Sequence, residues 1–363
     1  MPDIICNNEA QVSKNISGQP FLNKINATES TQDPLPWLAA VLRDESPAWP
    51  FGSEPADIER VMKAAQTEGV NGLLQAGLSR YTDPGDLPAA LLSALHRRIQ
   101  RESDLEISRE IELERVFNVL AQAALSPLII KGTALAYTLY SAPHLRSRCD
   151  TDLLFPDRAS ADQAWTVLQQ TGYRRSNAVS GEFISQEFAC YRTDGLKCEL
   201  RAQFRTVKIR HYVSLISPHP TLWQSNRLIW LYDIHLLAGH FTPADWAIYA
   251  DTAIRLGLSS ICLDGLLITQ RRFSTVIPED VMDALRSGAS TDWLTPGLLA
   301  GRAGNLYAGF RSLPDWRSRM ILLRESLFPD ARYMLEKYQN AHSWRFPLLY
   351  LQRIFTGILK QIR

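Results

Sequence analysis

The sequence has almost no net charge, few cysteines and no motif that pairs them. Lys and Arg number 39 against 38 Asp and Glu in 363 residues, a net charge of +1. This balance excludes nucleic-acid binding through bulk positive charge, although it leaves a local basic patch open. The five cysteines include no C-x-x-C pair, and no secretory signal precedes them. We therefore expect free thiols in a reducing compartment and a cytoplasmic protein.

Long apolar runs and internal repeats are missing as well. A membrane-spanning helix needs about 20 apolar residues, and the most apolar stretch, residues 227–239, is shorter and carries charged side chains. We expect no membrane partner. Hydrophobic residues make up 45% of the chain, which excludes a fully disordered protein. At roughly 150 residues per domain, the length suggests two or three domains.

Composition and periodicity divide the chain into four parts. Residues 1–34 are polar and predict a mobile tail, whereas residues 35–125 show helical spacing of apolar side chains. Residues 126–215 mix short apolar runs with helical stretches, and residues 216–363 are helical again. The order predicts an α+β fold, in which a small mixed-sheet core lies between two helical regions.

Individual elements follow from the same patterns. We expect strands at residues 128–130 and 150–155, and a hairpin over residues 185–204 whose turn holds Asp194 and Gly195. The expected helices cover residues 87–124, 133–140, 160–171, 226–238, 243–256, 261–271, 279–286, 316–327 and 346–362.

Two carboxylates stand two residues apart in the second expected strand. Asp150 and Asp152 flank Thr151, and side chains on a strand alternate between its faces, so both acids point the same way. Their mutual repulsion is relieved by a divalent cation, and hard oxygen ligands suit Mg²⁺ or Mn²⁺. The alternative for such a pair is a solvated strand end.

The first expected strand runs into Lys131, Gly132 and Thr133, where a helix begins. A helix N-terminus offers backbone N–H groups and positive charge to an anion, and a glycine there allows close approach. We name residues 131–133 the Lys-Gly-Thr turn. It is not a Walker A loop, and its alternative interpretation is an ordinary strand-to-helix turn with a capping threonine.

A third carboxylate, Glu199, lies in the second arm of the expected hairpin among mostly apolar neighbours. A metal is one reason for an acid at this position. The alternative is a surface residue that shares its face with Lys197 and Arg201.

Together, a phosphate-binding turn, two acids on the next strand and one on a later strand indicate two-metal chemistry. Two metal ions about 3.5 to 4 Å apart stabilise the attacking and leaving oxygens of an in-line displacement. The reaction would be attack of an acceptor on the α-phosphorus of a nucleoside triphosphate, with release of pyrophosphate.

Residues 128–173 resemble the polymerase-β type nucleotidyltransferase superfamily, and within it the uncharacterised nucleotidyltransferases. That group has a pattern close to L-K-G-x-A-L, followed by a tyrosine, an arginine and D-x-D-L-L. Here residues 130–135 read Ile-Lys-Gly-Thr-Ala-Leu, Tyr140 and Arg146 follow, and residues 150–154 read Asp-Thr-Asp-Leu-Leu. Residues 230–234, around Asp233, are also similar to that group.

The resemblance implies a role for each matching residue. Asp150, Asp152 and Glu199 would be catalytic and would bind Mg²⁺ or Mn²⁺, with two ions expected. Glu199 would also help to deprotonate the acceptor hydroxyl. Lys131, Gly132, Thr133 and Arg146 would bind the nucleotide phosphates, with the arginine as a bidentate clamp. The implied substrate is an NTP, with ATP favoured, and the acceptor stays open between a small molecule, a protein or peptide, and RNA; the charge balance does not favour nucleic acid.

Two departures from the family pattern give a second hypothesis. The turn has Gly-Thr where Gly-Ser or Gly-Gly is more usual, and Glu199 is followed two residues later by Arg201 instead of a histidine. The alternative function is a catalytically inactive nucleotide-binding or regulatory module on the same fold.

Other side chains were weighed against plainer interpretations. We expect Arg148 to be a solvated loop arginine, and Asp233 either lines the site or lies on a helix surface. The aromatic residues Trp223, Trp230 and Tyr232 are expected to belong to the core and not to a platform for stacking bases.

Overall fold

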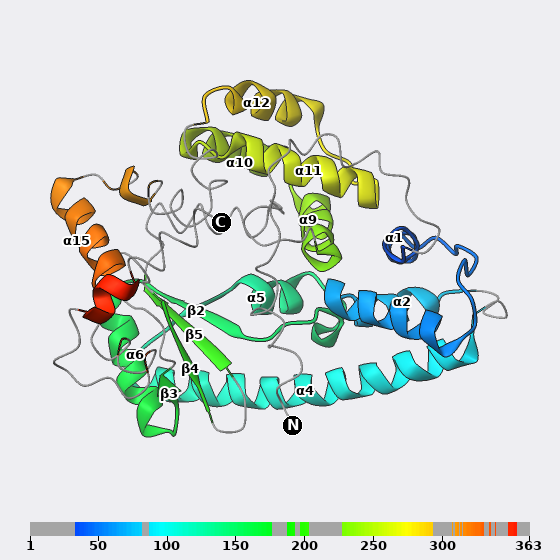
Figure 1. Ribbon diagram of the computed structural model, residues 1–363, viewed down its shortest axis with the longest axis horizontal. Helices are drawn as coiled ribbons and strands as arrows, with labels where there is room; N and C mark the ends of the chain where they lie inside the picture. The colour runs from blue at the N-terminus through cyan, green and yellow to red at the C-terminus, as the bar shows by residue number, and fades with distance from the viewer. Residues whose placement is uncertain are drawn as a thin grey trace.

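The structure is a computed structural model that describes residues 33–81, 87–175, 187–192, 197–202 and 227–292, together with parts of 307–353. Within these residues the fold is α+β, as the sequence predicts (Figure 1). The expected tail, except for its last two residues, lies outside the described residues, as do the hairpin turn at Asp194 and Gly195, the aromatic residue Trp223 and most of the last expected helix.

Four helices form the N-terminal helical region, and they pack their apolar faces together. Trp37, Leu38, Val61 and Leu74 are among the side chains buried between them. The helices are α1 (Leu35–Leu42), α2 (Pro55–Glu68), α3 (Asn71–Leu78) and α4 (Ala89–Gln122).

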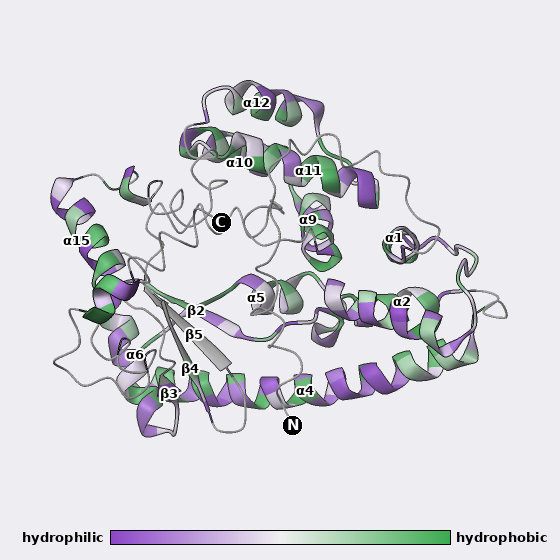
Figure 2. Ribbon diagram, in the orientation of Figure 1, coloured by the Kyte–Doolittle hydropathy of each residue, from purple (hydrophilic) through white to green (hydrophobic). Residues whose placement is uncertain are grey.

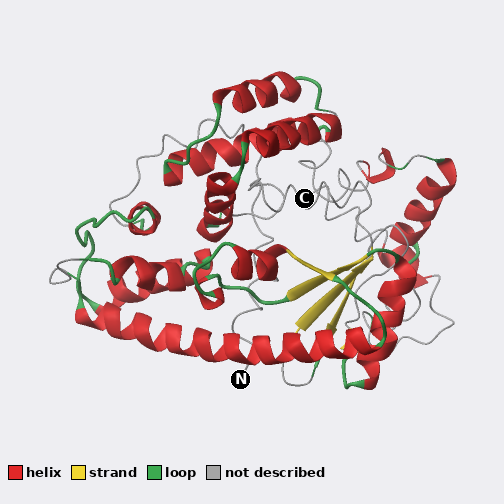
Figure 3. Ribbon diagram, turned by 180° about the vertical axis from the view of Figure 1, so that it is seen from behind, coloured by secondary structure: helices red, strands yellow, loops and turns green. Residues whose placement is uncertain are grey.

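Helix α4 is the longest element and joins the helical region to the sheet. Its 34 residues span about 51 Å at 1.5 Å per residue. The helix passes below α2 at one end and below the sheet at the other (Figures 1 and 3). Hydrophilic and hydrophobic residues alternate along it (Figure 2). Its N-terminal half packs Leu91 and Leu95 into the first core, and its C-terminal half packs Val116 and Leu120 beneath the sheet.

The sheet is mixed and has five strands in the order β1-β2-β5-β4-β3. Strand β2 is antiparallel to β1 and parallel to β5, and the expected hairpin is formed by antiparallel β4 and β5. The strands are β1 (Leu128–Ile130), β2 (Thr151–Phe155), β3 (Arg174–Arg175), β4 (Glu187–Tyr191) and β5 (Lys197–Ala202).

Two short helical elements and one longer helix surround these strands. Helix α5 (Lys131–Thr138) follows β1 directly, the 3-10 helix η4 (Pro143–Leu145) precedes β2, and α6 (Arg158–Gln170) packs on β2 and β5. Leu153, Phe155 and Leu168 are fully buried between β2, α6 and α4. This packing fixes the position of β2, an interior strand of the sheet, against α4 and α6.

The C-terminal helical region follows the sheet. Thr242 caps α10 through a reciprocal capping box with Asp245, and Gly257 ends that helix in the left-handed conformation. The helices are α9 (Leu228–His240), α10 (Pro243–Leu256), α11 (Ser259–Phe273), α12 (Glu279–Ala289) and α15 (Trp316–Leu327). Within the described residues, no helix combines the length and the apolar character needed to cross a membrane.

Helix α9 is shared by two cores. Leu228, Ile229 and Leu231 pack among the N-terminal helices, whereas Ile234 and Ala238 pack against α10, α11 and α12. At its start, the backbone N–H of Leu228 donates to the Glu68 carboxylate of α2 over 2.6 Å. Figure 1 shows α9 between α11 and α5. The helix therefore connects the C-terminal region to the N-terminal helices.

Candidate active site

The Lys-Gly-Thr turn begins α5 in a backbone conformation that an L-residue rarely adopts. Ile130 is extended, and Lys131 has φ of 56°. A left-handed residue other than glycine costs roughly 1–2 kcal/mol. The Lys131 side chain crosses to the neighbouring strand, where Nζ donates to Asp152 Oδ1 over 2.9 Å. The strained residue thus places an ammonium group on one of the expected metal ligands.

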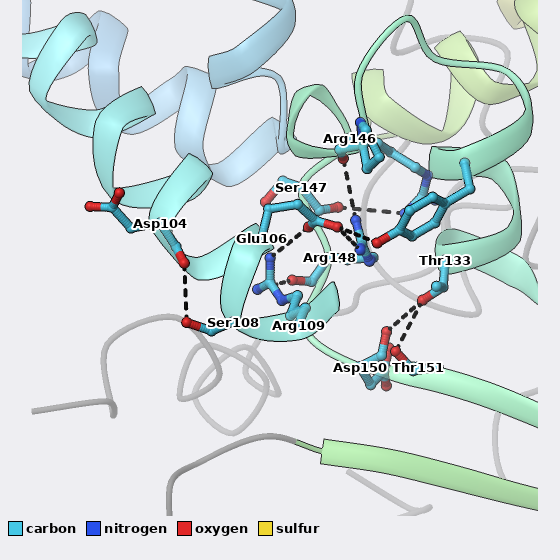
Figure 4. Close-up of polar contacts among 12 residues, drawn as sticks. Asp104, Glu106, Ser108, Arg109, Thr133, Arg146, Ser147, Arg148, Asp150 and Thr151 are labelled. Atoms are coloured by element: carbon cyan, nitrogen blue, oxygen red, sulfur yellow. Dashed lines mark hydrogen bonds and ion pairs between the residues drawn. The ribbon is translucent and has the colours of Figure 1, made fainter. Parts of the chain in front are cut away.

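Thr133 ties the same turn to the start of β2. Its side chain is buried, and Oγ1 donates to the Asp150 carbonyl oxygen over 3.2 Å and lies 3.3 Å from Thr151 Oγ1. Figure 4 shows both contacts. The hydroxyl group therefore connects α5 to the segment that carries both aspartates.

The two aspartates lie on and just before β2, an interior strand of the sheet. Asp152 is 3% exposed and pairs in register with Ile130 of β1 on one side and with Glu199 of β5 on the other. Asp150 is half-buried just before the strand. Because neighbouring strands lie about 4.8 Å apart, residues paired across parallel strands such as Asp152 and Glu199 are adjacent on the sheet.

The donor set suits a hard divalent cation. Asp150 and Asp152 could supply carboxylate oxygens to such a cation, Glu199 is the register partner of Asp152, and the ammonium group of Lys131 contacts Asp152. Among the described residues there is no group of three His, Cys, Asp or Glu side chains that could hold a metal ion. The side chain of Glu199 lies outside the part of the chain that the structure describes.

Arg146 is held by a buried pair of contacts from the C-terminal region. Its Nε donates to Asp233 Oδ1 over 3.0 Å, and its Nη2 donates to Asp233 Oδ2 over 2.6 Å. The Tyr140 hydroxyl donates to Asp233 Oδ1 over 2.7 Å. Asp233 is 4% exposed, so of the two alternatives left open by the sequence, a helix-surface acid is excluded.

These contacts set the ionisation of both partners of Asp233. Burial opposes the charge of Arg146, but Asp233 outweighs burial and raises the pKa of the arginine. Burial, followed by the negative charge of Asp233, raises the pKa of Tyr140 well above its usual value. Arg146 is therefore charged, and the hydroxyl group of Tyr140 is neutral.

Gly132 packs directly against this arginine. A Cβ atom at position 132 would lie 2.4 Å from Arg146 Nη1 and 3.1 Å from Cζ. Only glycine leaves room for the guanidinium group here. The sequence predicts Gly132 as the point where a phosphate approaches the backbone, and the structure adds that the arginine covers one side of it.

A second set of ionic contacts holds the loop before β2 onto α4. Arg148 Nη2 pairs with Glu106, which also accepts a 3.0 Å hydrogen bond from the Tyr137 hydroxyl. Arg109 Nη2 donates to the Arg148 carbonyl oxygen over 2.7 Å. Figure 4 shows Glu106, Arg109 and Arg148 meeting between α4 and the loop. The expectation that Arg148 is solvated is wrong, because this arginine is buried and forms an ion pair with the buried Glu106 of α4.

A sequence signal for this contact exists but is weak. The buried positions of α4 continue from Leu95 and Ile99 to Glu102 and Glu106 at helical spacing. Glutamates in an apolar stripe predict buried cationic partners. The sequence does not say that the partner is Arg148, because the contact joins residues 42 positions apart.

The expected site residues come together in pairs. Lys131 contacts Asp152, Thr133 contacts Asp150, Gly132 packs on Arg146, and Asp152 is the register partner of Glu199. Tyr140 and Asp233 join this cluster through Arg146. We name these residues the turn–strand cluster.

One of three comparisons with known proteins gave a match. The family model described as uncharacterised nucleotidyltransferase matches residues 54–212, a segment that contains all seven expected site residues. Neither the search of curated proteins nor the search of solved structures gave a match. The family match supports a general role in nucleotidyl transfer, and the resemblance expected from the sequence is confirmed: residues 54–212 match the uncharacterised nucleotidyltransferase family.

Proposed function

We propose that this protein is a metal-dependent nucleotidyltransferase. It transfers a nucleoside monophosphate from an NTP, with ATP favoured, to a hydroxyl group of an acceptor and releases pyrophosphate. The observation that carries the proposal is the contact between the Lys-Gly-Thr turn and Asp152, which is the register partner of Glu199. A phosphate-binding turn and a carboxylate pair in contact are the two parts that this chemistry needs.

The turn binds the triphosphate in this proposal. The backbone N–H groups at the start of α5 face the β- and γ-phosphates, where the helix N-terminus adds positive charge. Gly132 permits the close approach, and Thr133 keeps the turn against the segment that carries Asp150. Lys131 exchanges Asp152 for a phosphate oxygen when the nucleotide binds.

Asp150, Asp152 and Glu199 would hold Mg²⁺ or Mn²⁺, with two ions expected. When bound, the metal would supply charge neutralisation for the phosphates and for the attacking and leaving oxygens. Glu199 accepts the proton of the acceptor hydroxyl. A bond forms from the acceptor oxygen to the α-phosphorus while the bond from that phosphorus to the bridging β-phosphate oxygen breaks.

The alternative is a nucleotide-binding module that does not turn over. Arg201, which stands where related sequences often have histidine, favours this alternative. Both hypotheses include metal-dependent nucleotide binding, so binding alone does not separate them. Pyrophosphate release does.

The test measures pyrophosphate release from each of the four NTPs with Mg²⁺ or Mn²⁺, with and without a cell extract as acceptor source. An α-labelled NTP marks the modified acceptor. Wild type is compared with Asp152→Asn and with Asp162→Asn, a control that removes an exposed carboxylate of α6. We expect Asp152→Asn to lose at least about a hundredfold in rate, because first-sphere metal ligands matter more than outer ones.

The outcomes separate the two functions. Release by wild type and Asp162→Asn but not by Asp152→Asn supports the transferase. Nucleotide binding without release in any condition supports the inactive module. Absence of metal-dependent nucleotide binding by wild type contradicts both.

A further inference from the structure

Most of the hydrogen-bonding nitrogens of Arg146 are used by contacts within the protein. Two of its three guanidinium nitrogens donate to Asp233, and its side chain is 8% exposed. The third, Nη1, makes a long hydrogen bond of 3.5 Å to the Ser147 carbonyl oxygen and faces Gly132. The edge of the guanidinium group that does not contact Asp233 is thus the edge that packs on the turn.

The charge of this arginine is already compensated. Asp233 carries the opposite charge at hydrogen-bond distance, and the pair is buried. An arginine whose charge is balanced in this way contributes little net positive potential to a phosphate, but a bidentate pair fixes its plane. The contacts therefore favour a geometric role for Arg146 over an electrostatic one.

Asp233 brings in a distant part of the chain. It lies on α9, 93 residues after Tyr140, and its neighbours on that helix pack into both helical cores. The turn consequently rests on a chain of contacts from Gly132 through Arg146 to α9. Tyr140, just after α5, joins the same carboxylate from the other side.

We propose that Asp233 and Tyr140 are positioning residues that hold the Lys-Gly-Thr turn in its phosphate-binding conformation through Arg146. The proposal rests on the proposed function, because it assigns these two residues to the same nucleotide site. It makes the docking of α9 a condition for nucleotide binding. It also assigns Arg146 to the support of the turn, with Nη1 and Cζ packed on Gly132.

Steady-state kinetics with the NTP test the effect on the site. The variants are Asp233→Asn, which keeps one acceptor oxygen, and Tyr140→Phe, which removes one hydroxyl. Asp251→Asn, an exposed carboxylate of α10, is the control. We expect Asp233→Asn to raise KM about tenfold with kcat within about threefold, because the turn binds ground state and transition state alike. Tyr140→Phe raises KM less.

A merely structural role gives a different pattern. Fewer folded molecules lower the apparent kcat and leave KM unchanged. An arginine that binds phosphate through its charge gives the opposite sign, because Asp233→Asn releases that charge and KM falls. Either of these results contradicts the proposal.

Hydrogen exchange measured by mass spectrometry supplies a readout that needs no activity. Peptides over residues 128–140 are expected to exchange faster in Asp233→Asn than in wild type and Asp251→Asn, while peptides over α6 stay unchanged. Equal exchange over residues 128–140 in all three proteins overturns the positioning role. If wild type releases no pyrophosphate, the proposed transferase fails, and the exchange comparison still decides whether Asp233 holds the turn.

Discussion

Two buried aspartates of the turn–strand cluster, Asp152 on β2 and Asp233 on α9, are paired in different ways. Asp152 accepts a 2.9 Å contact from a lysine whose side chain is 20% exposed. Asp233 accepts both ends of a buried guanidinium fork and a tyrosine hydroxyl. An ammonium group is a mobile point charge, whereas a guanidinium fork fixes orientation.

The difference separates a contact that can exchange from one that is permanent. Lys131 can leave Asp152 for a phosphate or yield to a metal ion, because its ammonium group reaches solvent. Arg146 has no such path without leaving Asp233 charged and buried. We infer that the β2 side of the cluster does the chemistry and that the α9 side holds the scaffold.

The largest expected effect is on stability and comes from truncating the two aspartates in turn. Asp233→Ala leaves Arg146 as a buried charge without its main partner, which costs about 3–5 kcal/mol of unfolding free energy. Asp152→Ala leaves a partly exposed lysine, which costs about 1 kcal/mol or less. Urea denaturation of both variants measures the contrast. Equal losses would show that the two pairs do not differ in the way proposed.

The next largest loss of stability is expected from Gly132→Ala. The added Cβ meets a guanidinium group that is pinned by two hydrogen bonds and cannot move aside. Overpacking of this kind costs about 1–3 kcal/mol. The matched control is Gly239→Ala in α9, where nothing lies within 4 Å of a new Cβ and the substitution is expected to be neutral or stabilising. A neutral Gly132→Ala in the same denaturation assay would contradict the close packing.

Lys131→Met tests whether the contact between Lys131 and Asp152 can be exchanged for a metal ion. Removing the ammonium group uncovers Asp152 Oδ1 and leaves the carboxylates more negative, so Mn²⁺ is expected to bind about tenfold more tightly. Nucleotide affinity falls, because the phosphate loses a cation. Electron paramagnetic resonance of free Mn²⁺ measures the metal affinity, with the exposed Lys63→Met as control. Weaker Mn²⁺ binding in Lys131→Met would show that the lysine does not compete with metal.

The smallest effect concerns Glu68, another buried carboxylate, which accepts the backbone N–H of Leu228. Burial raises its pKa above the ordinary 4.5 in the folded state. Between the pKa of the unfolded state and the raised pKa of the folded state, the folded state binds more protons. The free energy of unfolding therefore falls as pH rises through that window. Glu68→Gln removes this dependence.

We expect the unfolding free energy of Glu68→Gln, relative to wild type, to increase as pH rises from about 4.5 toward neutral, since the amide does not ionise. Thermal denaturation at several pH values measures the difference. A difference that stays constant with pH would mean that the carboxylate has the same pKa in the folded and unfolded states.

Local patterns predicted much of this fold. The expected helices at residues 243–256 and 316–327 agree with α10 and α15 at both ends, and the strand at 128–130 agrees with β1. The helix expected at residues 133–140 is instead α5 at Lys131–Thr138, and its first residue has a left-handed φ that no helix propensity predicts. The pairing of β4 with β5 followed from the hairpin pattern, but the parallel pairing of β2 with β5 did not.

In the candidate site, too, short-range patterns could be predicted from the sequence and long-range contacts could not. Residues close in sequence, such as Gly132 with Thr133 or Asp150 with Asp152, carry patterns that short-range physics explains. Asp233 and Arg148 do not, because their partners lie 87 and 42 residues away. A charged side chain in a loop or helix is solvated or buried according to what the fold brings to it.

The sequence by itself determined the alternation of helices and strands, the acids and the turn that indicate nucleotidyl transfer, and the family that residues 54–212 match. These depend on periodicity and on residue spacing, which are local. Only the tertiary structure decided that a lysine contacts Asp152, that an arginine covers Gly132, and that α9 supplies the carboxylate that fixes it. Those contacts depend on the packing of segments remote in the chain, which local sequence does not encode.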